Sequence, residues 1–140
     1  DKPLIPYPQH DKLDPKIQEI LNQVDRHEKK RLGRQEIPKI WRALARNPHY
    51  LEATWAKHHL LFDRPGIDPN AKLAIGLGVS VTNGCNYFIR YFVDGIRQLQ
   101  WDDDKILEVI GVVDHYNSSN TIATGMQIKS DITTESALEE

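Results

Sequence analysis

The sequence predicts an all-α protein. No segment alternates apolar and polar residues with the period of two that a half-buried strand shows, whereas apolar residues recur at intervals of three and four along several stretches. Helix-start signals recur as well, because an Asp or Asn stands directly before a proline three times. The side-chain oxygen can cap the helix, and proline is well tolerated at the first helical position. The pairs Asp14-Pro15, Asn47-Pro48 and Asp68-Pro69 therefore predict the starts of three helices.

Three helices are expected in the first half of the chain. The first begins after Asp14 and ends at Gly33, and a short second helix covers residues 37–46. The third begins after Asn47 and ends before Pro65-Gly66. The first two helices have inward apolar residues at helical spacing: Ile17, Ile20, Leu21 and Val24, then Ile40, Trp41 and Leu44. The third runs into Leu51, Trp55 and the Leu60-Leu61 pair.

Four further helices are expected in the second half. Residues 69–81 are apolar nearly all round, which predicts a central buried helix, and its Gly76 and Gly78 favour close helix packing. A helix over residues 85–99 follows the break at Asn83-Gly84. Asp102 caps the next helix, whose inward residues include Ile106 and Val113, and a last helix covers residues 116–128.

Composition indicates one globular domain. The chain has 140 residues, of which 39% are hydrophobic and 27% charged, with a formal net charge of −2. We expect an extended N-terminal arm over residues 1–11, a helical domain over residues 12–129 and an acidic tail over residues 130–140. The 18 basic residues do not exceed the 20 acidic ones, which argues against a nucleic-acid partner.

Neither a membrane span nor a disulfide is expected. The apolar stretch from Leu73 to Val81 is far shorter than the roughly 20 residues of a helical crossing. The first residues lack the features of a secretory signal, so we expect a cytoplasmic protein, although an export signal removed before Asp1 would leave no trace. A single cysteine, Cys85, excludes an intrachain disulfide and a Cys-rich zinc site.

The histidines and aromatic residues offer weaker signals. His58 and His59 are adjacent and the other four histidines are scattered, so the sequence predicts surface or cap histidines, no metal site and no cofactor. Tyr87, Phe88, Tyr91 and Phe92 form a dense aromatic strip. Packing in the core or at a subunit interface is one use for this strip, and an apolar small-molecule pocket is the other.

Three motifs carry a family resemblance. They are residues 43–55 (ALARNPHYLEATW), residues 77–87 (LGVSVTNGCNY) and residues 112–117 (VVDHYN), the last followed by Asn120, Ala123 and Asp131. Together they resemble the carboxymuconolactone decarboxylase superfamily, and within it the alkyl hydroperoxidase D (AhpD)-like branch, over about residues 40–131. The resemblance implies an AhpD-like orthogonal bundle of about six to seven helices that assembles as trimers or hexamers.

The resemblance also implies where a redox site would lie. Redox members of this branch resemble small thiol peroxidases with a Cys-x-x-Cys pair at the start of a helix, a His four residues after the second Cys and a Glu twelve residues before the first. In this chain the first cysteine falls on Cys85, the second on Phe88, the His on Phe92 and the Glu on Leu73. The three replacements are apolar, so we expect a degenerate site without the disulfide chemistry.

Several interpretations of the region stay open. Cys85 is either a small buried hydrophobe, a thiol in the first turn of a helix that acts alone with an external thiol, or a ligand-contacting thiol. Tyr87, Tyr91, His115 and Asn120 are candidates for a pocket or an interface. Decarboxylase chemistry of the kind found elsewhere in the superfamily would need carboxylate-binding groups and a proton donor, for which Arg90, Arg97 and His115 are candidates.

Our main hypothesis is therefore an altered or non-catalytic family member. It would be a homo-oligomer or a subunit of a larger assembly, in which the former active site has become packing or an apolar pocket. The alternatives are a thiol-dependent peroxide reductase that uses Cys85 alone and a decarboxylase-type enzyme.

Overall fold

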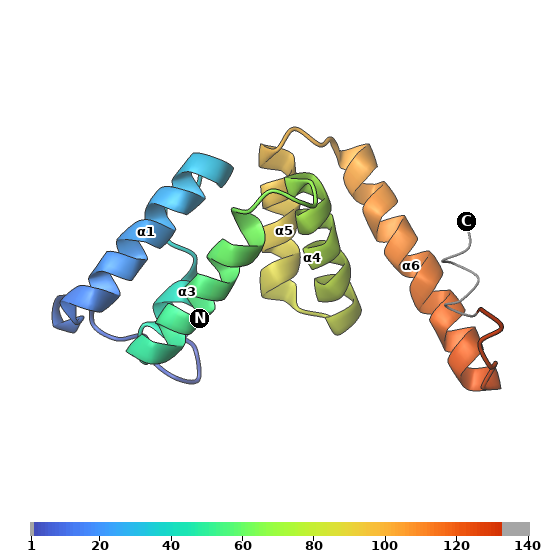
Figure 1. The fold of residues 1–140 in the computed structure, drawn as a ribbon, viewed down its shortest axis with the longest axis horizontal. Helices are drawn as coiled ribbons and strands as arrows, with labels where there is room; N and C mark the ends of the chain where they lie inside the picture. The colour runs from blue at the N-terminus through green and yellow to red at the C-terminus, as the bar shows by residue number, and fades with distance from the viewer. Residues whose placement is uncertain (1, 133–140) are drawn as a thin grey trace.

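The computed structural model of the chain describes residues 2–132. Within that range the regular secondary structure is helical, with loops between the helices and no strand (Figure 1). Six α-helices and one 3-10 turn follow one another along the chain. They are η1 (His10–Lys12), α1 (Pro15–Leu32), α2 (Lys39–Leu44), α3 (Pro48–Phe62), α4 (Pro69–Asn83), α5 (Asn86–Gln98) and α6 (Asp103–Met126). The all-α prediction is confirmed.

The helix starts predicted from sequence are confirmed in atomic detail. Asp14 accepts a hydrogen bond from the N–H of Lys16, Asn47 from that of Tyr50 and Asp68 from that of Asn70. Asp102 caps α6 in the same way through the N–H of Lys105. At the C-terminal ends, Gly33 and Gly84 close α1 and α4 with φ values of 60° and 68°, a left-handed conformation that glycine adopts without strain.

The predicted boundary between two C-terminal helices is wrong. Residues 103–126 form one continuous helix, α6, because Gly111 and the polar residues from Asp114 onward stay helical and no proline interrupts the hydrogen bonding. The short helix predicted over residues 37–46 is confined to Lys39–Leu44. Helix α3 already ends at Phe62, before the Pro65-Gly66 pair.

The apolar interior consists of two separate clusters. The first joins α1, α2 and α3, and the second joins α4, α5 and the start of α6 with Leu32 at the end of α1. Figure 1 shows the corresponding arrangement, with α1 and α3 on one side, α4 and α5 in the middle and α6 on the far side. The buried members are Ile17, Ile20, Leu21, Val24, Trp41, Ala45, Leu51 and Trp55 in the first cluster and Leu32, Leu73, Leu77, Ile96 and Ile106 in the second.

Helix α4 is only partly buried, contrary to the prediction of a central buried helix. Leu73, Leu77 and Ser80 face the interior, but the side chains of Ile75 and Val79 are 56% and 55% exposed. The reason is that α5 and α6 cover only part of the α4 surface, which leaves one apolar side uncovered.

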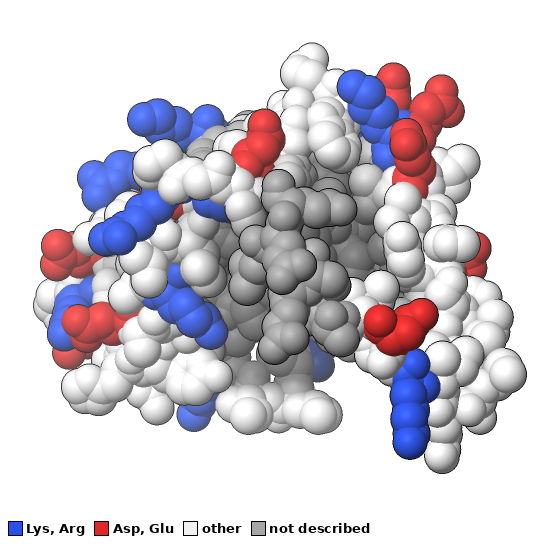
Figure 2. Space-filling model, turned by 45° about the vertical axis from the view of Figure 1, so that its right-hand side comes forward, with Lys and Arg blue, Asp and Glu red and all other residues white. Residues whose placement is uncertain are grey.

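Helix α6 leaves the body of the molecule toward its C-terminal end (Figure 1). The side-chain amide of Asn117 on α6 donates a hydrogen bond of 3.1 Å to Oγ1 of Thr82 on α4. A Cβ added at Gly125 would meet nothing within 4 Å. Beyond Asn117 the helix exposes Ile122 and Met126, and Figure 2 shows few charged side chains over the lower part of the side where α6 lies. Within residues 2–132, this part of the helix therefore presents exposed apolar side chains.

None of the helices in residues 2–132 combines the length and hydrophobicity that a membrane crossing requires. The predicted acidic tail, residues 130–140, lies outside the described residues from position 133 onward. The division into an arm, a domain and a tail stays a prediction.

Candidate functional site

Four positions match the redox relay, and we call them together the Cys85 face. They are Leu73, Cys85, Phe88 and Phe92. Leu73 belongs to the buried core of the second cluster, and Phe92 packs against that cluster. A Cβ placed on Gly76 would lie 2.3 Å from Cζ of Phe92, so the ring rests directly on the α4 backbone at this glycine. The ring centroid of Phe88 is 5.8 Å from that of Phe92. Leu73, Phe88 and Phe92 contribute no side-chain polar group to this face.

Cys85 stands at the N-cap of α5, one residue before the first helical turn in which it was expected. Its side chain makes no capping hydrogen bond, and its backbone N–H donates to the carbonyl oxygen of Ser80 over 2.9 Å. The thiol is half-buried and carries no disulfide. It is the only thiol in the chain.

The other aromatic candidates on α5 point toward the N-terminal helices. Tyr87 accepts a hydrogen bond of 3.1 Å from the N–H of Ile40, and burial raises the pKa of its hydroxyl. Tyr91, next in sequence to Phe92, donates a hydrogen bond of 2.7 Å from its hydroxyl to Oε1 of Glu28 on α1. Both rings therefore connect α5 to the first half of the chain.

Glu28 is a buried carboxylate between the two apolar clusters. It is 1% exposed. Besides Tyr91, it meets Arg34, whose Nε lies 3.0 Å from Oε2 of Glu28. These two atoms form an ion pair without the angles of a directed hydrogen bond. Arg34 also reaches Oδ2 of Asp94 at 3.0 Å and the carbonyl oxygen of Tyr91 at 2.9 Å. The buried charge of Glu28 is thus compensated by a cation that other acceptors hold in place.

The environment keeps the Tyr91 hydroxyl protonated. Burial raises its pKa far above the ordinary value, and the negative charge of Glu28 acts in the same direction. The guanidinium carbon of Arg34 lies 4.2 Å from the centre of the Tyr91 ring and opposes this shift only in part. Tyr91 is therefore a fixed hydrogen-bond donor at neutral pH.

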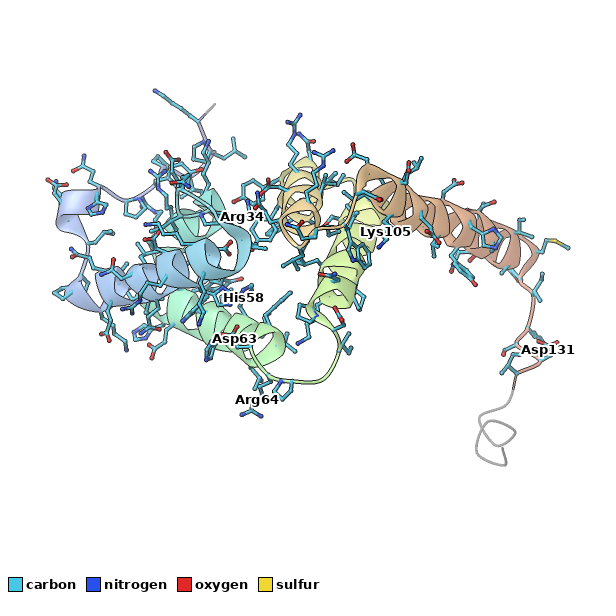
Figure 3. The ribbon with its side chains drawn as sticks, turned by 90° about the horizontal axis from the view of Figure 1, so that it is seen from above. Arg34, His58, Asp63, Arg64, Lys105 and Asp131 are labelled. Atoms are coloured by element: carbon cyan, nitrogen blue, oxygen red, sulfur yellow. The ribbon has the colours of Figure 1, made fainter. Side chains whose placement is uncertain are left out.

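Two histidines stand beside this carboxylate. His27 precedes Glu28 on α1, and His58 projects from α3; ligand atoms of His27, Glu28 and His58 all lie within 4.8 Å of one another. Nε2 of His27 is 2.8 Å from Oδ1 of Asp63, and the other carboxylate oxygen of Asp63, Oδ2, contacts Nδ1 of His59. Figure 3 shows Arg34, His58 and Asp63 near one another, around the part of α1 and α3 that faces α5. We call the group His27, Glu28, Arg34, His58 and Tyr91 the Glu28 cluster.

Two cavities lie next to the Glu28 cluster. One of about 300 Å³ is lined by His27, His58, Leu73 and Tyr91, among others, and one of about 230 Å³ by His58, Tyr91, Phe88 and Phe92, among others. Both are bordered by His58, Phe62 and Tyr91. The cavities therefore adjoin the same three side chains, with the Glu28 cluster on one side and part of the Cys85 face on the other.

The remaining sequence candidates are not gathered at this place. His115 and Asn120 are exposed on α6, where the Asn120 amide donates to the carbonyl oxygen of Tyr116. Arg97 pairs with Asp103, with its Nε 3.1 Å from Oδ1. Arg90 borders an open hollow of about 660 Å³ near residues 32–39, which Arg34, Tyr87 and Tyr91 also line. Within residues 2–132, no hydrogen bond or ion pair joins Arg90, Arg97 and His115. A role of His115 or Asn120 at an interface stays a prediction.

Sequence reasoning missed the Glu28 cluster. His27 and His58 were interpreted as surface or cap residues, but both are half-buried, because the packing of α1 against α3 brings two distant positions together. A signal was present nonetheless. Glu28 lies four residues after Val24, so it continues the inward stripe of α1, where an acidic side chain must find a partner.

Comparison with solved structures identifies the fold. The crystal structure of the alkylhydroperoxidase AhpD core from Rhodospirillum rubrum superposes with a TM-score of 0.82, covering 94% of this chain and 96% of that chain. The two sequences are 22% identical, so the likeness concerns the fold. No curated protein matches the chain by sequence.

The class of protein is thus an all-helical protein with the AhpD core fold. The model of the carboxymuconolactone decarboxylase family matches residues 48–128, which is more than half of the chain. The chain belongs to this family, and the resemblance inferred from the three sequence motifs is confirmed.

Proposed function

We propose that the chain is an altered-function member of the family, a homo-oligomeric subunit that binds a small molecule in the cavities beside the Glu28 cluster and lacks dithiol peroxidase activity. One observation carries the proposal. The half-buried side chains of His27 and His58 border the cavities on the side of α1 and α3, while Leu73, Phe88 and Phe92 occupy the positions where redox relatives would have Glu, Cys and His.

A dithiol cycle needs groups that this chain lacks. A thiolate that reduces a hydroperoxide becomes a sulfenic acid, and a second thiol must then attack its sulfur to form a disulfide with loss of water. Cys85 is the only cysteine, and neither Leu73 nor Phe92 can accept or donate a proton. Turnover through Cys85 alone would depend on an external thiol.

The cavity walls indicate the chemistry of the ligand. Phe62, Leu73 and Leu99 supply apolar surface to the cavity of about 300 Å³, and His27 and His58 supply nitrogen atoms. A ligand of matching chemistry has an apolar body and one hydrogen-bonding or anionic group directed at the histidines. Lys30 also borders this cavity, which favours an anionic group over a cationic one.

A peroxide assay tests the loss of redox function. The protein and its Cys85→Ser variant are incubated with an organic hydroperoxide and excess dithiothreitol, and peroxide consumption is followed. We expect both proteins to match the rate without protein. Turnover by the unaltered chain that the Cys85→Ser variant loses would contradict the proposal and support the single-thiol peroxidase.

Fluorescence of an apolar dye tests the cavity. N-phenyl-1-naphthylamine should bind the unaltered protein with saturable enhancement, and Leu99→Trp should weaken binding because the larger ring fills the cavity that Leu99 borders. Leu107→Trp is the matched control, since Leu107 is an exposed leucine on α6. The cavity proposal fails if the dye does not bind or if both variants behave alike.

The uncovered surface supports the oligomeric part of the proposal. Val112 and Tyr116 lie four residues apart on α6, as do Ile122 and Met126, and all four are exposed together with Ile75 and Val79 on α4. A surface of this kind is typical of an interface between subunits. A cytoplasmic location and a place in a larger assembly stay predictions.

Light scattering coupled to gel filtration tests the assembly. We expect a native mass that is a multiple of 16.1 kDa. Ile122→Glu should lower that mass, because it places a charge within apolar surface that a second copy would cover. Glu108→Gln on the same helix is the control, since its side chain is exposed and polar. A monomeric mass for the unaltered chain would exclude the homo-oligomer.

A further inference from the structure

We propose that His27, Glu28 and His58 bind a divalent transition-metal ion, of the class that includes Zn²⁺ and Co²⁺. The three residues offer two imidazole nitrogens and one carboxylate oxygen, and these ligand atoms lie within 4.8 Å of one another. Two nitrogens with one oxygen suit Zn²⁺ and similar ions, whereas Mg²⁺ and Ca²⁺ prefer oxygen ligands throughout. This inference does not depend on an organic ligand in the cavities.

The hydrogen bonding of His27 prepares one nitrogen for a metal. A carboxylate only accepts, so the contact of 2.8 Å between Nε2 and Oδ1 of Asp63 places the proton of a neutral His27 on Nε2. Nδ1 then carries a lone pair. This atom is buried and makes no hydrogen bond within the described part of the chain. A carboxylate behind a histidine, with the other ring nitrogen open to a ligand, is the arrangement that orients metal-binding histidines.

The ring of His58 is held by aromatic neighbours. Its centroid lies 4.6 Å from that of Phe62 and 5.6 Å from that of Trp55, with interplanar angles of 19° in both pairs. Trp41 meets it edge-on, with the centroids 5.3 Å apart. Such packing limits rotation of the ring, so less conformational entropy is lost when a metal binds.

Glu28 can serve the metal while it keeps its present partners. An ionised carboxylate has about four lone-pair positions, of which one accepts the Tyr91 hydroxyl at 2.7 Å. Oε2 faces Nε of Arg34 at 3.0 Å without a directed hydrogen bond. Arg34 has further acceptors in Asp94 and the carbonyl oxygen of Tyr91. The guanidinium repels a cation, so the site should bind a metal more weakly than one without it.

The cavity leaves space for a further ligand. Ligand distances of about 2.0–2.2 Å bring two ligand atoms of one ion within about 4.4 Å of each other, so small side-chain rotations suffice to close the group on an ion. His27 and His58 also border the cavity of about 300 Å³. Three protein ligands beside an accessible cavity correspond to a metal site with an open coordination position.

A cobalt titration of the full-length chain, prepared without a histidine tag and treated with a chelator, tests the site. Co²⁺ bound by two histidines and a carboxylate should give a visible absorption spectrum that saturates at about one ion per chain and disappears when Zn²⁺ is added. Thermal unfolding measured with and without Zn²⁺ gives an independent readout, because a ligand of the folded state raises the midpoint.

Two variants separate the site from adventitious binding. His58→Phe keeps an aromatic ring between Trp55 and Phe62 but removes the nitrogen, and we expect Co²⁺ affinity to fall by more than about tenfold. Glu28→Gln should lower it as well, with circular dichroism checking that the variant is folded. His49→Phe alters an exposed histidine on the same helix as His58 and should leave binding unchanged.

The outcomes decide the proposal. Saturable binding that His58→Phe loses and His49→Phe retains supports the metal site. Absence of a saturable cobalt spectrum overturns it, as does binding that His58→Phe leaves intact or that both histidine variants reduce equally. If Glu28→Gln does not fold, the two histidine variants and the zinc-dependent midpoint still give the answer.

Discussion

Tyr91 and Phe92 are neighbours on α5 and meet opposite kinds of surroundings. The Tyr91 hydroxyl enters the Glu28 cluster, where it donates to a carboxylate that also faces Arg34. The ring of Phe92 lies against the backbone of Gly76 on α4, within the Cys85 face. Two consecutive residues of α5 therefore face different parts of the interior, one polar and one apolar.

The difference shows that the fold can hold buried ionisable groups in one region while a neighbouring region is apolar. The Cys85 face stabilises the molecule through packing, whose strength depends on shape and volume. The Glu28 cluster stabilises it only if every buried charge keeps its partner. The two regions should therefore respond differently to substitution, to pH and to added thiols.

The largest effect is expected where a buried charge loses its partner. Glu28→Ala leaves Arg34, whose side chain is 17% exposed, without its most buried counter-ion and removes the acceptor of Tyr91. We expect the free energy of unfolding to fall by about 3–5 kcal/mol, measured by urea denaturation. Glu52→Ala breaks the exposed pair with Lys16 and should leave the unfolding midpoint nearly unchanged. Equal effects of the two variants would show that the Glu28 cluster behaves like surface charge.

In the Cys85 face, one added methyl group should lower the free energy of unfolding. Gly76→Ala would place Cβ 2.3 Å from Cζ of Phe92, so the ring and α4 must move apart. We expect a loss of about 1–3 kcal/mol in the free energy of unfolding. Gly111→Ala on α6 has nothing within 4 Å of the new methyl group and should instead raise it by about 0.5–1 kcal/mol. If Gly76→Ala stabilised the chain as Gly111→Ala does, the packing of Phe92 on α4 would be incorrect.

High pH should weaken the polar region selectively. Because the folded state holds the Tyr91 proton above its ordinary pKa, the unfolded chain binds fewer protons once the pH exceeds about 10. The contribution of this hydroxyl is complete below that pH and declines above it by about 1.4 kcal/mol per pH unit. The stability advantage of the unaltered chain over Tyr91→Phe should therefore shrink between pH 10 and pH 11, as urea denaturation at each pH would show.

An exposed tyrosine provides the control for this pH experiment. Tyr116 is 61% exposed on α6, and Tyr116→Phe removes a hydroxyl outside the Glu28 cluster. Its difference from the unaltered chain should stay constant over the same range of pH. A constant gap for Tyr91→Phe as well would contradict the burial of that hydroxyl against Glu28.

The last effect, which has a clear chemical readout, is expected from a second thiol. Phe88→Cys places a cysteine three residues after Cys85, a spacing whose Cα separation suits a disulfide. Diamide should then remove both free thiols without changing the native mass, and peroxide turnover should stay at background because Leu73 and Phe92 transfer no protons. Phe92→Cys is the control, since about 10 Å of helix rise over seven residues is too far for a bond. A free thiol pair in oxidised Phe88→Cys would show that the N-cap of α5 is oriented differently.

Most of the fold could be predicted from local signals. The caps at Asp14, Asn47 and Asp68 are decided by residues within one helical turn, which is why they hold in the structure. The continuity of α6 was missed because the apolar stripe stops after Val113, although a change to polar residues does not by itself end a helix. The exposure of Ile75 and Val79 was missed because the sequence of a helix that is apolar nearly all round does not reveal which of its sides other helices cover.

The candidate site could be predicted only in part. The correspondence of Leu73, Phe88 and Phe92 with a redox relay is what the family resemblance implies, and it stays a prediction. The approach of His27 to His58 depends on how α1 packs against α3, and the 30 intervening residues carry no spacing rule for it. Only Glu28, an acidic side chain in the line of Ile17, Leu21 and Val24, gave a local indication.

Because Gly76 lies against the ring of Phe92, a single replacement at either position 76 or position 92 should be costly. A histidine returned to position 92 would be smaller than the phenyl ring and would leave a hollow against bare α4 backbone, at a cost in stability that grows with the unfilled volume. A bulkier residue at position 76 would fill that hollow, but it collides with the phenyl ring for as long as the ring is there. Each replacement is thus costly alone, and the two positions would have to change together.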